Sequence, residues 1–173
     1  MKIGITGHQN LGSAENITWL SNTLKSTIKQ YKIDIGFTSL AIGADQLFAE
    51  TLRDLHIRYV VIIPCDGYEQ TFTTINDLIK YKSLLQNALE TVKLPFDKPS
   101  EEAFFEAGKQ IADASEMLIA VWNGQPAKGL GGTGDIVKYA LSINRTILHI
   151  NPITRTVDGL EPPFIRVSDP DIF

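Results

Sequence analysis

Short apolar runs alternate with segments of helical periodicity along most of this chain. The clearest apolar run is Arg58 to Pro64, with Tyr-Val-Val-Ile-Ile at its centre, which is typical of a fully buried strand. Such alternation is typical of a parallel sheet whose strands are joined by crossover helices. We therefore predict an α/β fold with an open, mostly parallel sheet and helices on both faces.

The predicted elements follow one another with short connections. The predicted strands cover residues 2–6, 34–39, 58–64, 91–94, 116–121 and 146–150. The predicted helices cover residues 13–29, 44–55, 69–90, 99–114 and 133–143, the third of them broken near Thr73 and Thr74. We predict a single domain, residues 1–173, with its core at about 1–150 and an extended, proline-containing tail at 151–173.

The composition is that of an ordinary globular protein, with 43% hydrophobic and 21% charged residues. The net charge is −4 and Lys and Arg are scattered, whereas nucleic-acid-binding proteins usually have a basic face, so nucleic acid is not an expected partner. The single cysteine, Cys65, suits a reducing compartment. With no leader or membrane-spanning run in the sequence, we expect a cytoplasmic protein without a membrane contact.

A glycine-rich stretch, Gly129-Leu130-Gly131-Gly132-Thr133-Gly134-Asp135, leads into the last predicted helix. Glycines let a backbone come close to a ligand, because no Cβ stands in the way. The first turn of a helix has unpaired N–H groups and a partial positive charge. Together these features predict a phosphate site, with the N–H groups of Gly131 to Gly134 and the Thr133 hydroxyl as donors.

The same stretch contains the spacing G-x-G-x-x-G, but it differs from the dinucleotide fingerprint. It begins several residues after its strand, and Arg155 stands about twenty residues further on, where an acidic residue would contact the ribose. A flexible turn with Thr133 as helix N-cap is the alternative interpretation. Asp135 is a candidate catalytic residue that accepts from a ribose hydroxyl or activates water; otherwise it is a favourable charge in the first helical turn.

A second candidate site is Ser39-Leu40-Ala41-Ile42-Gly43-Ala44-Asp45, where a predicted strand turns into a helix. Gly43 permits close approach of a ligand, and Asp45 lies in the first helical turn. We therefore name Ser39, Gly43, Ala44 and Asp45 as ligand-binding residues. A compact strand-to-helix turn without a ligand is the alternative.

The first predicted strand ends at Gly7-His8-Gln9, and these three residues are also expected to bind ligand. The His8 ring is able to bond a phosphate or ribose oxygen; the alternative is a loop histidine with no role in binding. Trp122 directly follows its strand and is placed to stack on a base, unless it is a partly buried core aromatic. Cys and His do not occur with the spacing of metal ligands, so neither a metal nor a cofactor is expected.

These segments are expected to meet at one edge of the sheet. In open α/β sheets, ligands bind beyond the carboxyl ends of the strands, where the strand order reverses. Loops 7–12, 39–45 and 122–135 all lie at such ends. Three residues at or after the end of the third predicted strand are expected to wall the same crevice: Pro64, Tyr68 and Phe72.

Three stretches together resemble the SLOG superfamily, which is named after the Smf/DNA-processing proteins and the lonely-guy proteins. They are Ile3-Gly4-Ile5-Thr6-Gly7-His8-Gln9, Ser39-Leu40-Ala41-Ile42-Gly43-Ala44-Asp45-Gln46 and Gly131-Gly132-Thr133-Gly134-Asp135. The second is similar to the S-G-x-A-x-G-x-D motif of the DNA-processing branch, and the third to the G-G-x-G-T-x-E-E motif of the lonely-guy branch. The resemblance covers about residues 3–150 and implies a Rossmann-like sheet, a nucleotide-derived ligand and a homodimer.

The chain departs from both branches. Lonely-guy enzymes cleave the N-glycosidic bond of nucleoside monophosphates with a glutamate pair and an arginine. Here the pair position is Asp135-Ile136, and no arginine lies between Arg58 and Arg145, where the catalytic arginine of that family would fall. The DNA-processing branch binds single-stranded DNA on a basic face, which this acidic chain lacks.

The sequence thus predicts binding or sensing of a nucleotide or nucleotide-sugar phosphate, such as a nucleoside monophosphate or an ADP-ribose-like molecule. The alternative is a nucleoside 5′-monophosphate phosphoribohydrolase of the lonely-guy type, an N-glycosyl hydrolase with Asp135 as catalytic residue, so whether the chain is an enzyme stays open. A third possibility is an interaction subunit whose dimer surface is its function.

Overall fold

The computed structural model describes residues 1–126 and 131–160, which contain one seven-stranded sheet. The strands are β1 (Lys2–Gly7), β2 (Ile35–Thr38), β3 (Arg58–Ile63), β4 (Glu90–Lys93), β5 (Met117–Val121), β6 (Thr146–Asn151) and β7 (Thr156–Leu160). Their order across the sheet is β4-β3-β2-β1-β5-β6-β7, and every pair is parallel except β6 with β7. The predicted mostly parallel sheet is therefore confirmed.

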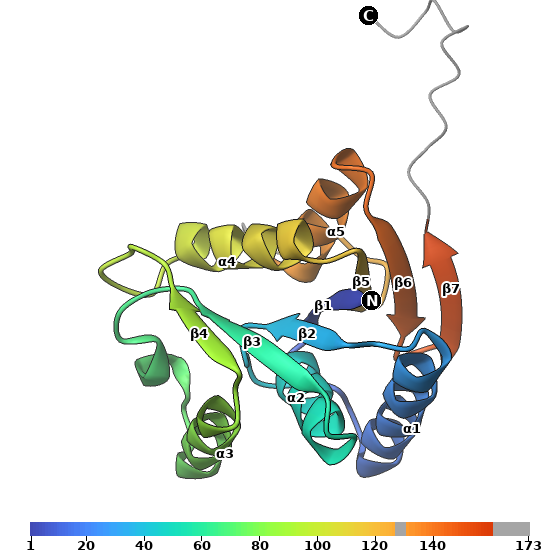
Figure 1. The fold of residues 1–173 in the computed structure, drawn as a ribbon, viewed down its shortest axis with the longest axis horizontal. Helices are drawn as coiled ribbons and strands as arrows, with labels where there is room; N and C mark the ends of the chain where they lie inside the picture. The colour runs from blue at the N-terminus through green and yellow to red at the C-terminus, as the bar shows by residue number, and fades with distance from the viewer. Residues whose placement is uncertain (127–130, 161–173) are drawn as a thin grey trace, which may run out of the picture.

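Helices cover both faces of this sheet, as Figure 1 shows. They are α1 (Ala14–Gln30), α2 (Ala44–Asp54), α3 (Ile75–Gln86), α4 (Glu101–Ala114), α5 (Thr133–Ser142) and the short 3₁₀ helix η1 (Tyr68–Thr71). Helices α1, α2 and α3 lie on one face, and α4 and α5 lie on the other (Figure 1). This is the three-layered, Rossmann-like α/β arrangement that the alternating pattern predicts.

Each face of the sheet has its own apolar core. On one face, Ile3 and Ile5 of β1 pack in a cluster with Leu24 of α1 and Phe48 of α2. On the other face, the side chains of β5 and β6 cluster with those of α4 and α5, including Ile136. All five residues of β5 are buried, because this strand is central and both of its faces are covered.

Polar side chains begin three of the helices. Ser13, Thr74 and Ser100 accept hydrogen bonds from the amides of Asn16, Asp77 and Ala103 respectively. Such N-caps satisfy amides that have no partner within the helix. Thr74 separates η1 from α3, which confirms the break expected near Thr73 and Thr74.

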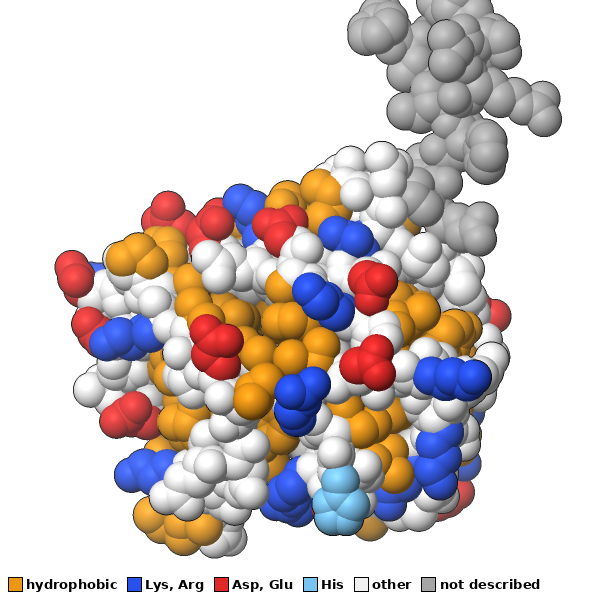
Figure 2. Space-filling model, viewed as in Figure 1, with side chains coloured by type: hydrophobic (Ala, Val, Ile, Leu, Met, Phe, Trp, Pro, Cys, Tyr) orange, Lys and Arg blue, Asp and Glu red, His pale blue; other side chains and the backbone are white. Residues whose placement is uncertain are grey.

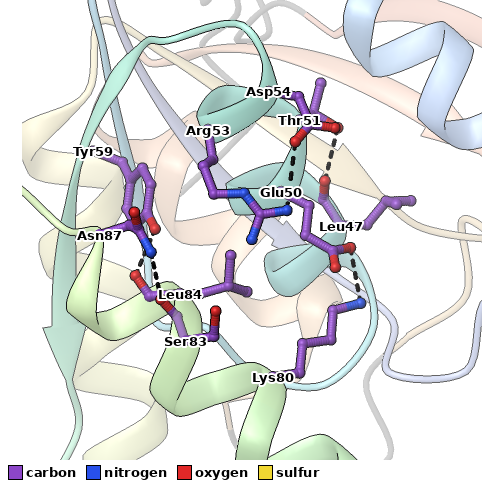
Figure 3. A network of polar contacts seen from close by, with 10 residues as sticks. All are labelled: Leu47, Glu50, Thr51, Arg53, Asp54, Tyr59, Lys80, Ser83, Leu84 and Asn87. Carbon is purple, nitrogen blue, oxygen red and sulfur yellow. Dashed lines mark hydrogen bonds and ion pairs between the residues drawn. The ribbon is translucent and has the colours of Figure 1, made fainter.

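Helix α3 is fastened to its neighbours by the polar contacts in Figure 3. The Lys80 ammonium lies 2.8 Å from a Glu50 carboxylate oxygen of α2, and the Tyr59 hydroxyl of β3 donates to the Leu84 carbonyl. Tyr81 of α3 in turn packs edge-on against Tyr68 of η1, with 5.8 Å between ring centroids. These contacts fix η1 beside the carboxyl end of β3.

The segment after β6 differs from the predicted extended tail. Asn151 accepts bonds from the amides of Ile153 and Thr154 and closes a turn, after which Thr156–Leu160 pairs antiparallel with β6. Four of the five residues of β7 are exposed, so the strand lacks the buried apolar pattern that identifies a strand in a sequence. The rest of the predicted tail, residues 161–173, lies outside the described residues.

The strand order reverses at β1. The chain moves outward from β1 through β2 and β3 to β4, and then returns to place β5 on the other side of β1. The loops that follow β1 and β5 therefore diverge to opposite faces of the sheet. Open α/β sheets form a ligand-binding crevice at such a point.

The surface shown in Figure 2 carries both signs of charge. Lys and Arg side chains alternate there with Asp and Glu, and apolar side chains lie between them. This face therefore has no continuous basic patch of the kind that binds a nucleic-acid backbone. Among the helices in the described part of the chain, none has the length and apolar character needed to cross a membrane.

Candidate ligand-binding site

A cavity of about 820 Å³ opens at the carboxyl edge of the sheet, where the strand order reverses. Its walls come from the loops after β1, β2, β3, β5 and β6, together with residues of α4 and the start of α5. Ligand sites in proteins commonly enclose roughly 300–1,000 Å³. The cavity therefore has room for a molecule the size of a nucleotide.

Most of the residues named from the sequence lie around this cavity. The lining includes Gly7, His8, Gln9, Ser39, Asp45, Trp122, Gly131, Gly132, Thr133 and Gly134. Gly43, Ala44 and Asp135 are not part of it. The first two residues of the glycine-rich motif, Gly129 and Leu130, lie outside the described residues.

The loop after β1 is held by hydrogen bonds on two sides. The His8 amide donates to Val121 O of β5 at 3.0 Å, and the His8 carbonyl accepts from the Ala44 amide of α2 at 3.1 Å. The Asn123 amide donates to His8 Nε2 at 3.2 Å. With Nε2 an acceptor, this geometry assigns the proton of the neutral ring to Nδ1.

Gly43 and Ala44 support this loop from behind. Gly43 has φ of +91°, and a Cβ there would lie 2.6 Å from the carbonyl carbon of Gln9 and closer still to the His8 and Gln9 oxygens. The Cβ of Ala44 faces Gly7, where only a residue without a side chain fits. The close approach that Gly43 permits is thus to the protein's own backbone.

Asp45 is a buried carboxylate at the start of α2, with 6% of its surface exposed. Its Oδ2 accepts bonds from Thr38 Oγ1 and from the Ser39 amide, each at 2.9 Å. Burial raises the pKa of Asp45 from 3.8 to about 6, opposed by the hydrogen bonds from Ser39, Thr38 and Ala41. The carboxylate therefore closes the turn after β2 and also contributes charge to the cavity.

The start of α5 also lines the cavity. Gly131 has φ of +83°, and a Cβ there would come within 2.9 Å of the Phe105 amide nitrogen and 3.0 Å of Glu101 O, so glycine lets the chain pass close to α4. Gly132 is the N-cap of α5. Among the described residues, no acceptor is found for the amides of Thr133 and Gly134, as expected for the first turn of a helix.

Asp135 lies on another side of α5. Its amide donates to Gly132 O at 2.9 Å, and its carboxylate lies 3.9 Å from the Lys138 ammonium, one turn along the helix. This side chain is 26% exposed and does not contribute to the cavity wall. The structure thus places it as a first-turn charge beside the site.

Aromatic side chains form an apolar wall. The ring centroids of Tyr68 and Phe72 lie 5.5 Å apart in an edge-on arrangement, and the ring centroid of Phe104 of α4 lies 6.2 Å from that of Tyr68. Trp122 lines the cavity too, while its Nε1 donates to Gln125 O at 2.7 Å. Such flat apolar surfaces suit a nucleobase.

The sequence analysis missed part of the lining. It named the expected wall residues Pro64, Tyr68 and Phe72, but not Asn16, Phe104, Pro152 or Ile153. Pro152 and Ile153 follow β6 at the same edge, so the rule that placed the other loops applies to them. Asn16 and Phe104 come from the first turns of α1 and α4, which no local motif connects with the site.

The cavity holds little charge. Asp45 and His8 are the only acidic or basic side chains among the described residues that line it. In residues 1–126 and 131–160, His, Cys, Asp and Glu do not gather in groups of three that could hold a metal ion. An anion bound in this cavity would therefore be attracted mainly by backbone amides and helix starts.

No protein-family model matches this chain, and a search of curated proteins finds no match. Several solved structures are similar to it. DNA processing protein A from Helicobacter pylori, described by its single-stranded DNA binding mode, has a TM-score of 0.64 at 14% identity over 87% of this chain and 65% of that one. DNA processing protein A from Streptococcus pneumoniae has a TM-score of 0.63 at 13% identity, over 87% of this chain and 50% of that one.

A third similar structure is the molybdenum cofactor binding protein from Rippkaea orientalis. Its TM-score is 0.54 at 13% identity, and the alignment covers 86% of this chain and 74% of that one. At such low identity these similarities establish the fold. They confirm the Rossmann-like fold that the SLOG resemblance implies, and the chain spans 65% and 50% of the two DNA processing proteins.

Proposed function

We propose that this chain binds a nucleotide or nucleotide-sugar phosphate, a nucleoside monophosphate or an ADP-ribose-like molecule, in the cavity at the carboxyl edge of the sheet. One observation carries the proposal. The cavity joins the start of α5, with its amides, to a wall of aromatic side chains. An anionic group and a flat apolar ring are the two parts of a nucleotide.

The phosphate is assigned to the start of α5. Thr133 and Gly134 present amides there, and Gly131 lets the backbone reach this position by passing close to α4. A helix start contributes roughly 0.3–1 kcal/mol to a nearby anion, and up to about 2 kcal/mol where it is partly buried. The Thr133 hydroxyl adds a further donor.

The base is assigned to the aromatic wall. Tyr68 and Phe72 are nearly buried, so they present ring surface that is already in place before a ligand arrives. Preformed walls lower the entropy cost of binding. Similar solved structures carry descriptions of single-stranded DNA binding and of molybdenum cofactor binding, and both ligands contain phosphate.

We do not propose the hydrolase alternative. It requires a carboxylate at the glycosidic bond, and Asp135 is turned toward Lys138 outside the cavity wall. Asp45 does line the cavity, but the bonds of its Oδ2 to Thr38 and Ser39 hold it in the turn after β2, where it can accept a hydrogen bond from a ligand but is not assigned to the glycosidic bond. The arrangement favours holding a ligand over cleaving it.

Isothermal titration calorimetry with AMP, ADP-ribose and NAD tests the proposal. Thr133→Asp places a negative charge among the phosphate donors and should weaken binding at least about tenfold. Ser142→Asp adds the same charge at the far end of α5 and serves as the matched control. The proposal fails if none of the three compounds binds, or if both variants weaken binding equally.

Two further partners are measured alongside. A single-stranded oligonucleotide that binds while all mononucleotides fail would contradict the small-molecule proposal and favour a nucleic acid. The SLOG resemblance also implies a homodimer, which light scattering of the purified chain would reveal as twice the mass of 19.2 kDa.

A further inference from the structure

We propose that Tyr68 and Asp45 form a hydroxyl-binding subsite that selects a ribose-containing ligand. The inference rests on the proposed function and adds to it which part of the ligand lies on the β2–β3 side of the cavity. Both residues line the cavity, and they come from η1 and the start of α2. Together they are called the sugar subsite below.

Tyr68 supplies the first observation. Its side chain is almost enclosed, with 5% of the residue exposed, and yet no described residue hydrogen-bonds its hydroxyl group. Buried tyrosine hydroxyls usually have a partner, because an unpaired one loses the bonds it makes to water. Among the described residues, Arg145 Nε is the fully enclosed side-chain polar atom without a partner, and the Tyr68 oxygen is not fully enclosed. Water can therefore reach the Tyr68 oxygen, and a ligand group in the cavity would replace that water as its partner.

Asp45 supplies the second observation. It lines the same cavity from the turn after β2, the strand next to β3, which precedes η1. After burial, the Asp45 charge is the next cause that raises the pKa of Tyr68 above its usual value. Asp45 and Tyr68 are not hydrogen-bonded to each other, and the Asp45 Oδ2 atom bonds Thr38 and Ser39 instead. We assign one ligand group to the part of the cavity that these two residues line.

The chemistry of the two side chains selects that group. Ionised Asp45 only accepts, and the Tyr68 hydroxyl has a proton that needs an acceptor. A sugar hydroxyl satisfies both, because it donates to the carboxylate and accepts from the phenol. A phosphate would be repelled by Asp45, and an exocyclic amino group of a base has no lone pair free to accept from Tyr68.

The subsite also fixes the direction of the ligand. Phosphate lies at the start of α5, where the cavity has amides and no carboxylate, and the ribose hydroxyls lie toward Asp45 and Tyr68. The Tyr68 ring packs against the rings of Phe72 and Phe104, so the sugar subsite borders the apolar wall assigned to the base.

Tyr68→Phe is the direct test, because it removes the hydroxyl and keeps the ring. Tyr81→Phe is the matched control, since Tyr81 belongs to the same aromatic cluster, stacks on Phe72 at 4.6 Å and does not line the cavity. Calorimetry with AMP should show binding weakened about three- to tenfold by Tyr68→Phe and unchanged by Tyr81→Phe.

A ligand series completes the cycle. 2′,3′-Dideoxy-AMP should bind the wild-type chain about as weakly as AMP binds Tyr68→Phe, and Tyr68→Phe should weaken dideoxy-AMP no further. Inosine monophosphate, which lacks the exocyclic amino group, should keep the full effect of Tyr68→Phe. If the effect disappears with inosine monophosphate instead, the amino group occupies the subsite and the inference is wrong.

The remaining outcomes separate this inference from the function on which it rests. If AMP binds wild type, Tyr68→Phe and Tyr81→Phe equally well, the sugar subsite is overturned and the binding function stands. If AMP, ADP-ribose and NAD all fail to bind wild type, the binding function fails and the subsite falls with it. A lower melting temperature for Tyr68→Phe than for Tyr81→Phe would show that the protein itself bonds this hydroxyl, which also overturns the inference.

Discussion

The turn from β2 into α2 and the start of α5 are similar in sequence but have different structural roles. Each has a glycine and then an aspartate in the first helical turn, Gly43 with Asp45 and Gly134 with Asp135. In the first, the glycine packs on backbone and the aspartate faces the cavity. In the second, the glycines lie at the cavity and the aspartate faces Lys138.

The connection to the preceding strand explains the difference. Helix α2 follows β2 through a tight turn, so Asp45 reaches back to the strand end at Thr38 and Ser39. Helix α5 follows β5 after a longer stretch of sequence, in which Gly131 packs against α4, and residues 131–134 line the cavity. The same residue type in two similar motifs therefore has different roles, which depend on how the chain enters the helix.

Gly43→Ala should have the largest effect on stability. Its Cβ would overlap the carbonyl groups of His8 and Gln9, and φ of +91° is strained for any side chain. We expect a loss of more than about 3 kcal/mol in the free energy of unfolding. Gly124→Ala is the control, because φ there is +80° but no atom of the described residues lies within 4 Å of the added Cβ, so we expect only strain of about 1 kcal/mol. Equal losses in urea melts would refute the packing role of Gly43.

Asp45→Asn should change how stability depends on pH. Folding raises the pKa of Asp45 from 3.8 to about 6, so the protonated form is favoured in the folded chain. The stability that Asp45 contributes is fully present below its pKa in the unfolded chain. It is lost as the pH rises through its pKa in the folded chain. Wild type should therefore lose up to about 3 kcal/mol relative to Asp45→Asn between about pH 4 and pH 7.

Asp135→Asn is the matched comparison for that experiment. Its carboxylate is partly exposed, so replacing it should cost at most about 1 kcal/mol at neutral pH from the helix start, much less than the change expected for Asp45→Asn. Denaturant melts across the pH range measure both variants. The contrast between the two turns fails if Asp135→Asn shows the larger pH dependence.

Lys138→Ala should have the smallest effect. The ion pair with Asp135 spans 3.9 Å, and the Lys138 side chain is 73% exposed, so its loss should cost less than about 0.5 kcal/mol. AMP affinity should stay within about twofold, because neither partner lines the cavity. A larger change in affinity would place Asp135 at the ligand after all.

Much of the fold could be predicted from the sequence, because buried strands and amphipathic helices leave periodic patterns. The break near Thr73 and Thr74 and a short strand at 91–94 were predicted, and the structure has the N-cap Thr74 and strand β4 there. Strand β7 was not, because it is an exposed edge strand held by backbone pairing to β6, which leaves almost no apolar pattern.

The candidate site could be predicted as a set of loops but not as a set of side chains. The carboxyl-edge rule placed loops 7–12 and 39–45 at one cavity. The rotation of each helix start decides which residues face inward, and short motifs do not specify it, as Gly43, Ala44 and Asp135 show. Phe104 comes from a helix start with no motif, so only the three-dimensional arrangement reveals it.

A crystal structure of the chain with ADP-ribose tests the central claim most directly. The account predicts phosphate oxygens within hydrogen-bond distance of the Thr133 and Gly134 amides, with the aromatic wall of Tyr68 and Phe72 at the other end of the ligand. Phosphate bound elsewhere, or those two amides already bonded to the protein's own carbonyl groups, would contradict it.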